Sequence, residues 1–239
     1  MKTIHLTAGD ALAGDLENTK IDGVRLVCRE AFVDGPVDAP GGEEFWAARA
    51  AFVADAFGET AADYRRKTVA EFEKLESAAA GENEINLWFE YELFCRVNYW
   101  FCLDRLRDAR VPVFVVAPAV RSTEDRWQGF GGLSGEALEK CFAERRRLSA
   151  AEIKTGGALW RAFRTDDSEE LKRLSENGGD GLPFLNEVIA AALDRKTRVP
   201  QILREISDQS AADFPEIFRA FQSRAGVYGY GDAQVRRLL

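Results

Sequence analysis

Two glutamates, Glu90 and Glu92, stand two residues apart directly after the apolar run Ile85 to Phe89. Ionisable side chains rarely tolerate such surroundings without a partner. The run has the length and composition of a buried strand, and the residues after Glu92 have the pattern of a helix. Asp10 and Glu30 follow two other apolar segments in the same way. Because the carboxyl ends of parallel strands meet at one edge of a sheet, we expect these four carboxylates to lie together.

Carboxylates brought together would raise one another's pKa unless a cation is present. Mg²⁺ or Mn²⁺ is the simplest compensation, since hard cations take oxygen ligands. The expected metal ligands are Asp10, Glu90 and Glu92, and Glu30 joins them as a catalytic carboxylate. The chain has no fixed metal-ligand spacing such as H-E-x-x-H, so the prediction depends on the sheet edge alone.

An anionic substrate would suit this edge. Arg29 and Arg49 are placed to hold an anionic group through bidentate bonds, and Gly9, Trp46 and Tyr91 complete the expected substrate-binding set. Hydrolysis or transfer at a phosphoester or nucleotide-like substrate is the reaction that this arrangement favours. It would make the protein a metal-dependent phosphoester hydrolase.

Each of these residues also has a structural interpretation. Asp10 has the side chain of a helix N-cap, and Glu92 would favour a helix dipole at its N-terminus. Glu30 would pair with an arginine. Trp46 has the character of a core residue, and His5 on the first strand is more often a core histidine than a ligand.

The composition narrows the class of protein. The 239 residues are 46% hydrophobic with 16 Phe and 5 Trp, enough for one large domain or for a domain with an appendage. No apolar run approaches the roughly 18 to 20 residues of a membrane helix, and the N-terminus turns polar early, so we expect a cytoplasmic protein. The four Cys form no C-x-x-C pair and are predicted to be reduced core thiols; Cys95 lies one turn beyond Glu92.

Short apolar segments alternate with helical patterns through the first half. The predicted strands are Thr3 to Thr7, Val24 to Cys28, Ile85 to Phe89 and Val111 to Ala117. The predicted helices between them are Ala11 to Asn18, Glu43 to Phe57, Thr60 to Ala78 and Glu92 to Arg107. This alternation predicts an α/β fold: a short, mainly parallel, Rossmann-like sheet of about four strands with helices on both faces.

The second half is predicted to be helical, with no obvious strand after Arg121. Expected helices are Ser134 to Arg146, Ser149 to Arg164, Ser168 to Ser175, Pro183 to Asp194, Val199 to Asp208 and Phe214 to Arg224. Ser149 and Glu152 have the spacing of a capping box. We divide the chain into an α/β domain at 1–120, a helical extension at 121–178 and a small, helix-turn-helix-like module at 179–239.

The distribution of charged residues along the sequence indicates an alternative function. All the excess of the net −8 charge lies in residues 1–110, which hold 21 acidic and 13 basic side chains, and this argues against a nucleic-acid surface there. The helical C-terminal region instead carries Arg195, Lys196, Arg198, Arg204, Arg236 and Arg237. The alternative is therefore a non-enzymatic binding or regulatory protein whose C-terminal helices contact nucleic acid or a protein partner, although acidic residues are interleaved among those bases.

Two further segments have competing interpretations. Gly129 to Gly132 precedes a helix and could bind an anion at its N-terminus, but it lacks the Lys of a phosphate-binding loop. The most basic cluster in the sequence is Arg145 to Arg147, together with Arg161 and Arg164. A solvated helix face is the usual explanation of such a cluster, and nucleic-acid binding is the alternative.

Several motifs together resemble a bacterial family of domains of unknown function, number eighteen thirty-five. They are His5-x3-Gly9-Asp10, Arg29-Glu30-x4-Gly35-Pro36, Phe45-Trp46-x2-Arg49 and Trp88-Phe89-Glu90-x-Glu92-Leu93-Phe94-Cys95. The resemblance covers about the first 150 residues and continues more weakly through Gly129-x2-Gly132-Leu133-Ser134 and Gly231-Asp232. Similar sequences often have His at the position of Tyr91. The resemblance implies the α/β architecture and marks these positions without assigning an activity.

Overall fold

A computed structural model describes residues 2–81, 83–120, 122, 125–177, 181–209 and 213–239, and a five-stranded sheet is at its centre. The strands are β1 (Lys2–Thr7), β2 (Val24–Val27), β3 (Asn83–Trp88), β4 (Val113–Val116) and β5 (Arg146–Arg147), in the order β2-β1-β3-β4-β5. The first four are parallel and β5 is antiparallel to β4. The mainly parallel α/β fold predicted from the sequence is confirmed.

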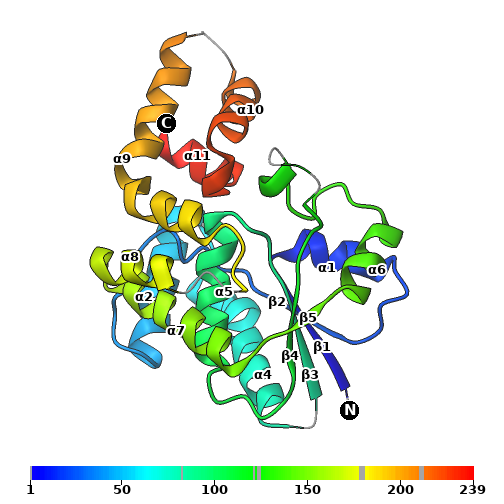
Figure 1. The fold of residues 1–239 in the computed structure, drawn as a ribbon. Helices are drawn as coiled ribbons and strands as arrows, with labels where there is room; N and C mark the ends of the chain where they lie inside the picture. Colours follow the sequence, from blue (N-terminus) through cyan, green and yellow to red (C-terminus); the bar gives the residue numbers. More distant parts are fainter. Residues whose placement is uncertain (1, 82, 121, 123–124, 178–180, 210–212) are drawn as a thin grey trace.

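Helices cover both faces of the sheet (Figure 1). The helical elements are α1 (Asp10–Glu17), α2 (Glu43–Phe57), α3 (Ala61–Tyr64), η1 (Arg65–Val69), α4 (Ala70–Ala79), α5 (Leu93–Arg105), η2 (Asp125–Trp127), α6 (Gly135–Ala143), α7 (Ala150–Arg164), α8 (Ser168–Asn177), α9 (Leu185–Gln209), α10 (Phe214–Ala225), η3 (Gly226–Tyr228) and α11 (Asp232–Leu238). Helices α1 and α6 pack on one face, and α4 and α5 on the other, with α7 packed on α5.

Burial on both faces explains why the strands are apolar without strict alternation. In β3 and the residue after it, Ile85, Leu87 and Phe89 belong to the large core on the α4/α5 side. Trp88 points to the opposite face and packs with Leu12 of α1 and other residues of the smaller core. The sheet therefore holds the chain rigidly up to the point where Glu90 begins.

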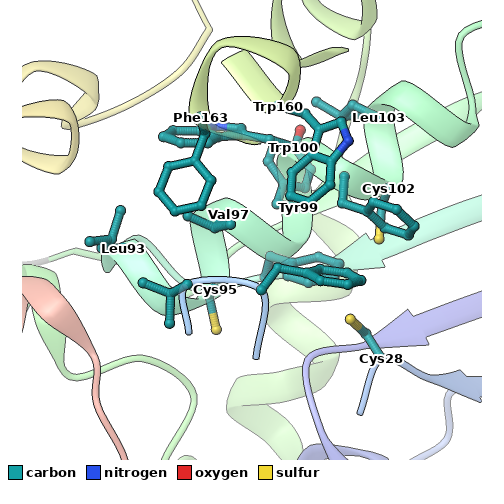
Figure 2. Packing of buried hydrophobic residues seen from close by; sticks show 14 of the residues in the cluster. Cys28, Leu93, Cys95, Val97, Tyr99, Trp100, Cys102, Leu103, Trp160 and Phe163 are labelled. Atoms are coloured by element: carbon teal, nitrogen blue, oxygen red, sulfur yellow. The ribbon is translucent and has the colours of Figure 1, made fainter. Parts of the chain in front are cut away.

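The large core is rich in aromatic rings, several of them on α5 and α7. Figure 2 shows Trp100, Trp160 and Phe163 packed between these two helices, and the Trp100 and Phe163 ring centroids are 6.3 Å apart. All four cysteines are free and buried, as predicted. Helix α5, which follows Glu92, is thus one of the most deeply buried elements, and it gives the adjacent site a fixed support.

The capping prediction at α7 is confirmed. Ser149 accepts a hydrogen bond from the Glu152 backbone N–H, and the Glu152 carboxylate accepts one from the Ser149 N–H at 2.8 Å. The capping interpretation of Asp10 is wrong. Gly9 occupies the N-cap position of α1, and Asp10 is the first helical residue.

The second half differs from its prediction in two places. The helix expected to reach Arg146 ends at Ala143, and the chain continues into β5, whose two arginines give no apolar strand signal. Two helices expected on either side of residues 195–198 are one helix, α9, with Pro200 inside it. A proline removes one helical hydrogen bond, but α9 runs on because its buried residues, Val199 and Ile202 among them, continue one packed face.

The C-terminal helices α9, α10 and α11 lie beyond the carboxyl ends of the parallel strands (Figure 1). Helix α5 contacts both α9 and η3, so this region is packed against the sheet domain. The predicted boundary at 120/121 touches residue 121, and the one at 178/179 touches residues 178–180, all outside the described residues. Within the described part of the chain, no helix combines the length and apolarity needed to cross a membrane.

Candidate functional site

The strand order reverses between β1 and β3, because the chain moves outward from β1 to β2 and then returns to β3. In open parallel sheets, ligands bind outside the carboxyl ends of the strands at such a point. The Ala8 N–H donates to the Trp88 carbonyl at 3.1 Å and joins the two strand ends. Glu90 and Glu92 follow immediately after this junction.

Glu90 lies on the loop between β3 and α5. Its Oε1 accepts a hydrogen bond from the Phe130 backbone N–H at 2.6 Å, and its Oε2 is 3.9 Å from the Cys95 Sγ. Burial, and secondly the charge of Glu92, raise the pKa of Glu90 to about 7, against the weaker opposing effect of the Phe130 hydrogen bond. Glu90 is therefore poised to gain or lose a proton near neutral pH.

Glu92 is the N-cap of α5. Its Oε1 accepts from the Cys95 backbone N–H at 3.0 Å, so the residue both begins the helix and faces the positive end of the helix dipole. Burial nevertheless raises the pKa of Glu92. Neither Glu90 nor Glu92 forms an ion pair with a described residue.

Cys95 completes the group. One oxygen of each glutamate and the Cys95 Sγ lie within 4.8 Å of one another, the spacing of atoms that could share a metal ion. Burial and the two neighbouring carboxylates raise the pKa of the Cys95 thiol well above its ordinary value. A protonated, buried thiol is a poor nucleophile, and it must lose its proton before it can bind a metal ion.

Two glycines with left-handed backbone, Gly129 (φ 69°) and Gly229 (φ 66°), make close contact with the glutamates. A Cβ on Gly129 would overlap the Glu90 carboxylate, and a Cβ on Gly229 would overlap the side chain of Glu92. Of these two glycine-rich segments, the sequence singles out Gly129 to Gly132, as a candidate anion-binding turn, and gives no sign of its contact with Glu90. Their positive φ angles and lack of a side chain let backbone from two distant segments close over the acidic pair.

The glutamates line a cavity of about 240 Å³. Its other walls come from the η2 loop, from α10 and η3, and from the segment before α11: Trp127, Gln128, Phe218, Phe221, Gln222, Ala225, Gly226, Gly229, Tyr230 and Gly231. The sequence analysis missed most of these residues. They are separated from Glu90 by 37 residues or more in the chain, and only the folded chain brings them together.

Asp10 and Arg29 form a separate pair at the edge of β1 and β2. The Arg29 guanidinium donates to both carboxylate oxygens of Asp10, at 2.7 to 3.0 Å, and to the Lys67 carbonyl at 2.7 Å. Both residues are exposed. Asp10 is not among the described groups that bring three ligand atoms within metal-binding range, so the structure does not unite the four carboxylates as expected.

Glu30 and Arg49 form a buried ion pair, with Arg49 Nη2 2.6 Å from Glu30 Oε2. The Tyr64 hydroxyl donates to the other Glu30 oxygen, and Arg49 also donates to the Asp34 carbonyl at 2.6 Å. Arg49 is fully buried. The donors expected to hold a substrate anion are thus engaged within the protein, and the pairing interpretation of Glu30 describes what the structure contains.

The other expected substrate-binding residues lie outside the acidic cavity. Trp46 is a core residue, stacked on Phe72 with ring centroids 5.5 Å apart. Tyr91 points to Phe184, at 5.2 Å between centroids. Gly9 is half-buried with φ 120°, and no heavy atom stands within 4 Å of where its Cβ would be.

His5 is a neutral core residue. Its Nδ1 accepts from the Trp88 indole N–H at 3.0 Å, which places the proton on Nε2, and Nε2 donates to the Asp22 carbonyl at 3.2 Å. Burial lowers the pKa of His5. The geometry therefore supports the interpretation of His5 as a core histidine and not as a ligand.

Arg96 is a cation that the sequence analysis overlooked. It is buried one turn beyond Glu92, with its guanidinium 4.8 Å from the Tyr91 ring centroid and 5.3 Å from that of Tyr99. Its Nε has no hydrogen-bond acceptor among the described residues. Arg96 lowers the pKa of Glu92 only weakly compared with the effect of burial, so it does not neutralise the acidic pair.

The basic residues of the second half are dispersed. Arg145 is close to Glu84 at 3.5 Å, Arg146 pairs with Glu152 at 2.6 Å, and Arg161 pairs with Asp104 at 2.5 Å. In the C-terminal region, Lys196 pairs with Asp166 and Arg198 with Glu205, and Arg237 with Asp34. The run Arg145 to Arg147 does not share one helix face, because α6 has already ended. These pairings leave the acidic cavity as the better-supported site.

Comparison with known proteins found no relative of this chain. No family model, no curated protein and no solved structure matches the chain. The resemblance to the bacterial family of domains of unknown function stays a prediction.

Proposed function

We propose that Glu90, Glu92 and Cys95 bind a divalent metal ion, and that the protein uses this ion to hydrolyse or transfer a phosphoester group of a small anionic substrate. The main support for this proposal is that two carboxylates and a thiol have ligand atoms within 4.8 Å of one another, at the point where the strand order of the parallel sheet reverses. Neither carboxylate has an ion-pairing cation among the described residues. A half-buried and a buried carboxylate this close together favour either a shared proton or a bound cation.

The choice of metal follows from the ligand atoms. Carboxylate oxygens suit Mg²⁺ and Mn²⁺, whereas a thiolate favours softer ions such as Zn²⁺. With Cys95 in the group, the site is better suited to Mn²⁺ or Zn²⁺ than to Mg²⁺. Binding requires deprotonated ligands, so metal affinity should increase with pH as Glu90 ionises around pH 7.

The cavity of about 240 Å³ leaves space beside the two glutamates for water and a phosphate group. A metal ion there would polarise a phosphoryl oxygen and lower the pKa of a bound water. In hydrolysis, the water oxygen bonds to phosphorus, the ester P–O bond breaks, and the proton lost by the water ends on the leaving oxygen. The glycines Gly129 and Gly229 allow the backbone to lie close to the two glutamates.

Thermal unfolding of EDTA-treated protein tests the metal site. Mg²⁺, Mn²⁺, Zn²⁺ and Ca²⁺ are added singly at pH 8 to the parent protein and to Glu90→Gln and Asp10→Asn. A ligand that binds only the native state raises the midpoint by mass action. We expect Mn²⁺ or Zn²⁺ to raise the midpoint of the parent and of Asp10→Asn, and not that of Glu90→Gln.

Asp10→Asn is the matched control because it removes one carboxylate that lies near the sheet edge but is paired with Arg29. An equal rise in Glu90→Gln would contradict the metal site, and so would the absence of a rise with every ion. Once a metal is identified, release of phosphate or of a chromogenic alcohol from model phosphomonoesters and phosphodiesters tests the reaction.

A further inference from the structure

A groove of about 1190 Å³ lies next to the acidic cavity. The two share four lining residues, Trp127, Gln128, Gln222 and Gly226, so the groove is adjacent to the acidic cavity. Ligand pockets for small molecules are usually about 300 to 1,000 Å³. The groove therefore accommodates a molecule considerably larger than a single phosphate group.

One wall of the groove carries a cation with free hydrogen-bonding capacity. Arg126 in η2 forms no ion pair with any residue that the structure describes, and its buried Nε has no acceptor there. Its guanidinium lies 5.2 Å from the centroid of the Trp127 ring, which fixes its position beside the groove. A buried donor without an acceptor is unfavourable in the empty protein, and an anionic ligand would satisfy it.

Another part of the lining is one face of α9, formed by Glu187, Ala190, Ala191 and Asp194 at helical spacing. The two alanines leave room between two carboxylates. Glu187 and Asp194 are exposed, and Asp194 accepts a hydrogen bond from the Tyr228 hydroxyl at 2.7 Å. Carboxylates in such a wall accept hydrogen bonds from hydroxyl and amino groups and repel phosphates.

From these three features we infer that the groove binds a nucleoside diphosphate, with one phosphate at the acidic cavity, the second phosphate at Arg126, and the hydroxyl and amino groups of the nucleoside along the α9 wall. The inference rests on the proposed function for the phosphate at Glu90 and Glu92. Bare pyrophosphate would meet Arg126 equally well, but it would leave the α9 wall and most of the groove volume unused.

Calorimetric titration with ADP, AMP and pyrophosphate, in the presence of Mn²⁺ at pH 8, tests this assignment. The proteins are the parent, Arg126→Gln and the control Arg198→Gln, which removes an exposed arginine of α9 that lies outside the groove lining. We expect Arg126→Gln to weaken ADP binding about tenfold or more, as for the loss of a charge-assisted hydrogen bond. AMP binding should change less than about threefold, and Arg198→Gln should bind all three probes like the parent.

Three outcomes would overturn the inference: ADP does not bind, Arg126→Gln binds ADP as tightly as the parent, or pyrophosphate binds as tightly as ADP. The last result would show that the nucleoside makes no contribution. Failure of the proposed function is distinguishable, because it appears in the metal titration without nucleotide. A metal response that depends on Glu90 together with an unchanged ADP affinity in Arg126→Gln would overturn the groove assignment alone.

Discussion

The carboxylates of Glu90 and Glu92 lie in one small cavity, and the charge of Glu92 helps to raise the pKa of Glu90 to about 7. Elsewhere the described part of the chain pairs its buried acids, as Glu30 with Arg49 shows. The pair at the sheet edge is different because backbone N–H groups and a thiol are its closest polar neighbours. An arrangement that keeps two acids without a cation destabilises the empty protein at high pH, and this has measurable consequences.

The first prediction concerns the pH dependence of stability. The pKa of Glu90 is raised from its ordinary value of 4.5 to about 7, so between these values the folded protein binds more protons at this residue than the unfolded chain does. The contribution of Glu90 to the free energy of unfolding should therefore decrease as pH rises from about 4.5 to 7 and become constant above that. The full effect of this shift is about 3.5 kcal/mol at most, since one pKa unit corresponds to about 1.4 kcal/mol.

Urea denaturation of the metal-free protein at pH 5 to 8.5 measures this slope. Glu90→Gln keeps the shape of the side chain but cannot ionise, so its stability should vary less with pH and exceed that of the parent at pH 8. Asp10→Asn should keep the slope of the parent. Equal slopes in the parent and in Glu90→Gln would show that Glu90 ionises normally.

The second prediction separates two effects of glycine. Gly129 and Gly132 both have positive φ angles, of 69° and 75°, so alanine at either position should cost about 1 to 2 kcal/mol of strain. Only at Gly129 would the new Cβ overlap a side chain, the Glu90 carboxylate; Gly132 has open space there. Because the end of a glutamate side chain can move, Gly129→Ala should lose the metal-induced rise in the unfolding midpoint while remaining folded.

Gly132→Ala serves as the matched control and should keep the metal response. The measurement is the same thermal series with Mn²⁺ or Zn²⁺, with circular dichroism to establish that both variants are folded. A retained metal response in Gly129→Ala would mean that the position of the Glu90 carboxylate does not matter for binding.

The third prediction assigns Arg49 to stability. Arg49→Met would leave Glu30 buried without its cation, a loss of about 3 to 5 kcal/mol. The double variant Glu30→Gln with Arg49→Met should lose less, because no uncompensated charge remains. Urea denaturation of both variants measures the difference. A loss below about 1 kcal/mol in Arg49→Met would contradict a structural role and restore the interpretation that Arg49 binds substrate.

The sequence predicts the sheet well because burial on both faces leaves short, largely apolar segments in β1 to β4. Strand β5 carries no such signal, since Arg146 and Arg147 are both exposed. Its position is determined by pairing with Phe114 and Val115 of β4. Helix α9 was divided because Pro200 disfavours a helix locally, and tertiary packing overrides that preference.

For the site, the sequence identifies Glu90 and Glu92, because acids after a buried strand are conspicuous. It does not distinguish them from Asp10 and Glu30, which follow strands in the same way but meet arginines in the folded protein. The partner of each acid comes from a distant segment of the chain. The local sequence does not determine the direction in which the acidic side chain points. The cavity walls of α10 and η3 are missed for the same reason.

The last prediction concerns the thiol. If Cys95 is a metal ligand, its replacement should change which metal is preferred, because sulfur favours Zn²⁺ over Mn²⁺ more than a hydroxyl does. Cys95→Ser should reduce the rise in the unfolding midpoint with Zn²⁺ and largely keep the rise with Mn²⁺. Added Co²⁺ should give the near-ultraviolet absorption of a cobalt–thiolate bond in the parent and not in Cys95→Ser.

Cys28→Ser is the matched control, since Cys28 is also a buried, free cysteine but is not part of the three-ligand group. Its stability should decrease because a buried sulfur is lost, as in Cys95→Ser. Its Zn²⁺ response and its Co²⁺ absorption should be the same as in the parent. The raised pKa of the Cys95 thiol adds a pH requirement, because the metal must displace its proton. Zn²⁺ binding by the parent should therefore weaken as pH falls, and more steeply than in Cys95→Ser. Identical Zn²⁺ responses in Cys95→Ser and the parent would leave only the two glutamates as ligands.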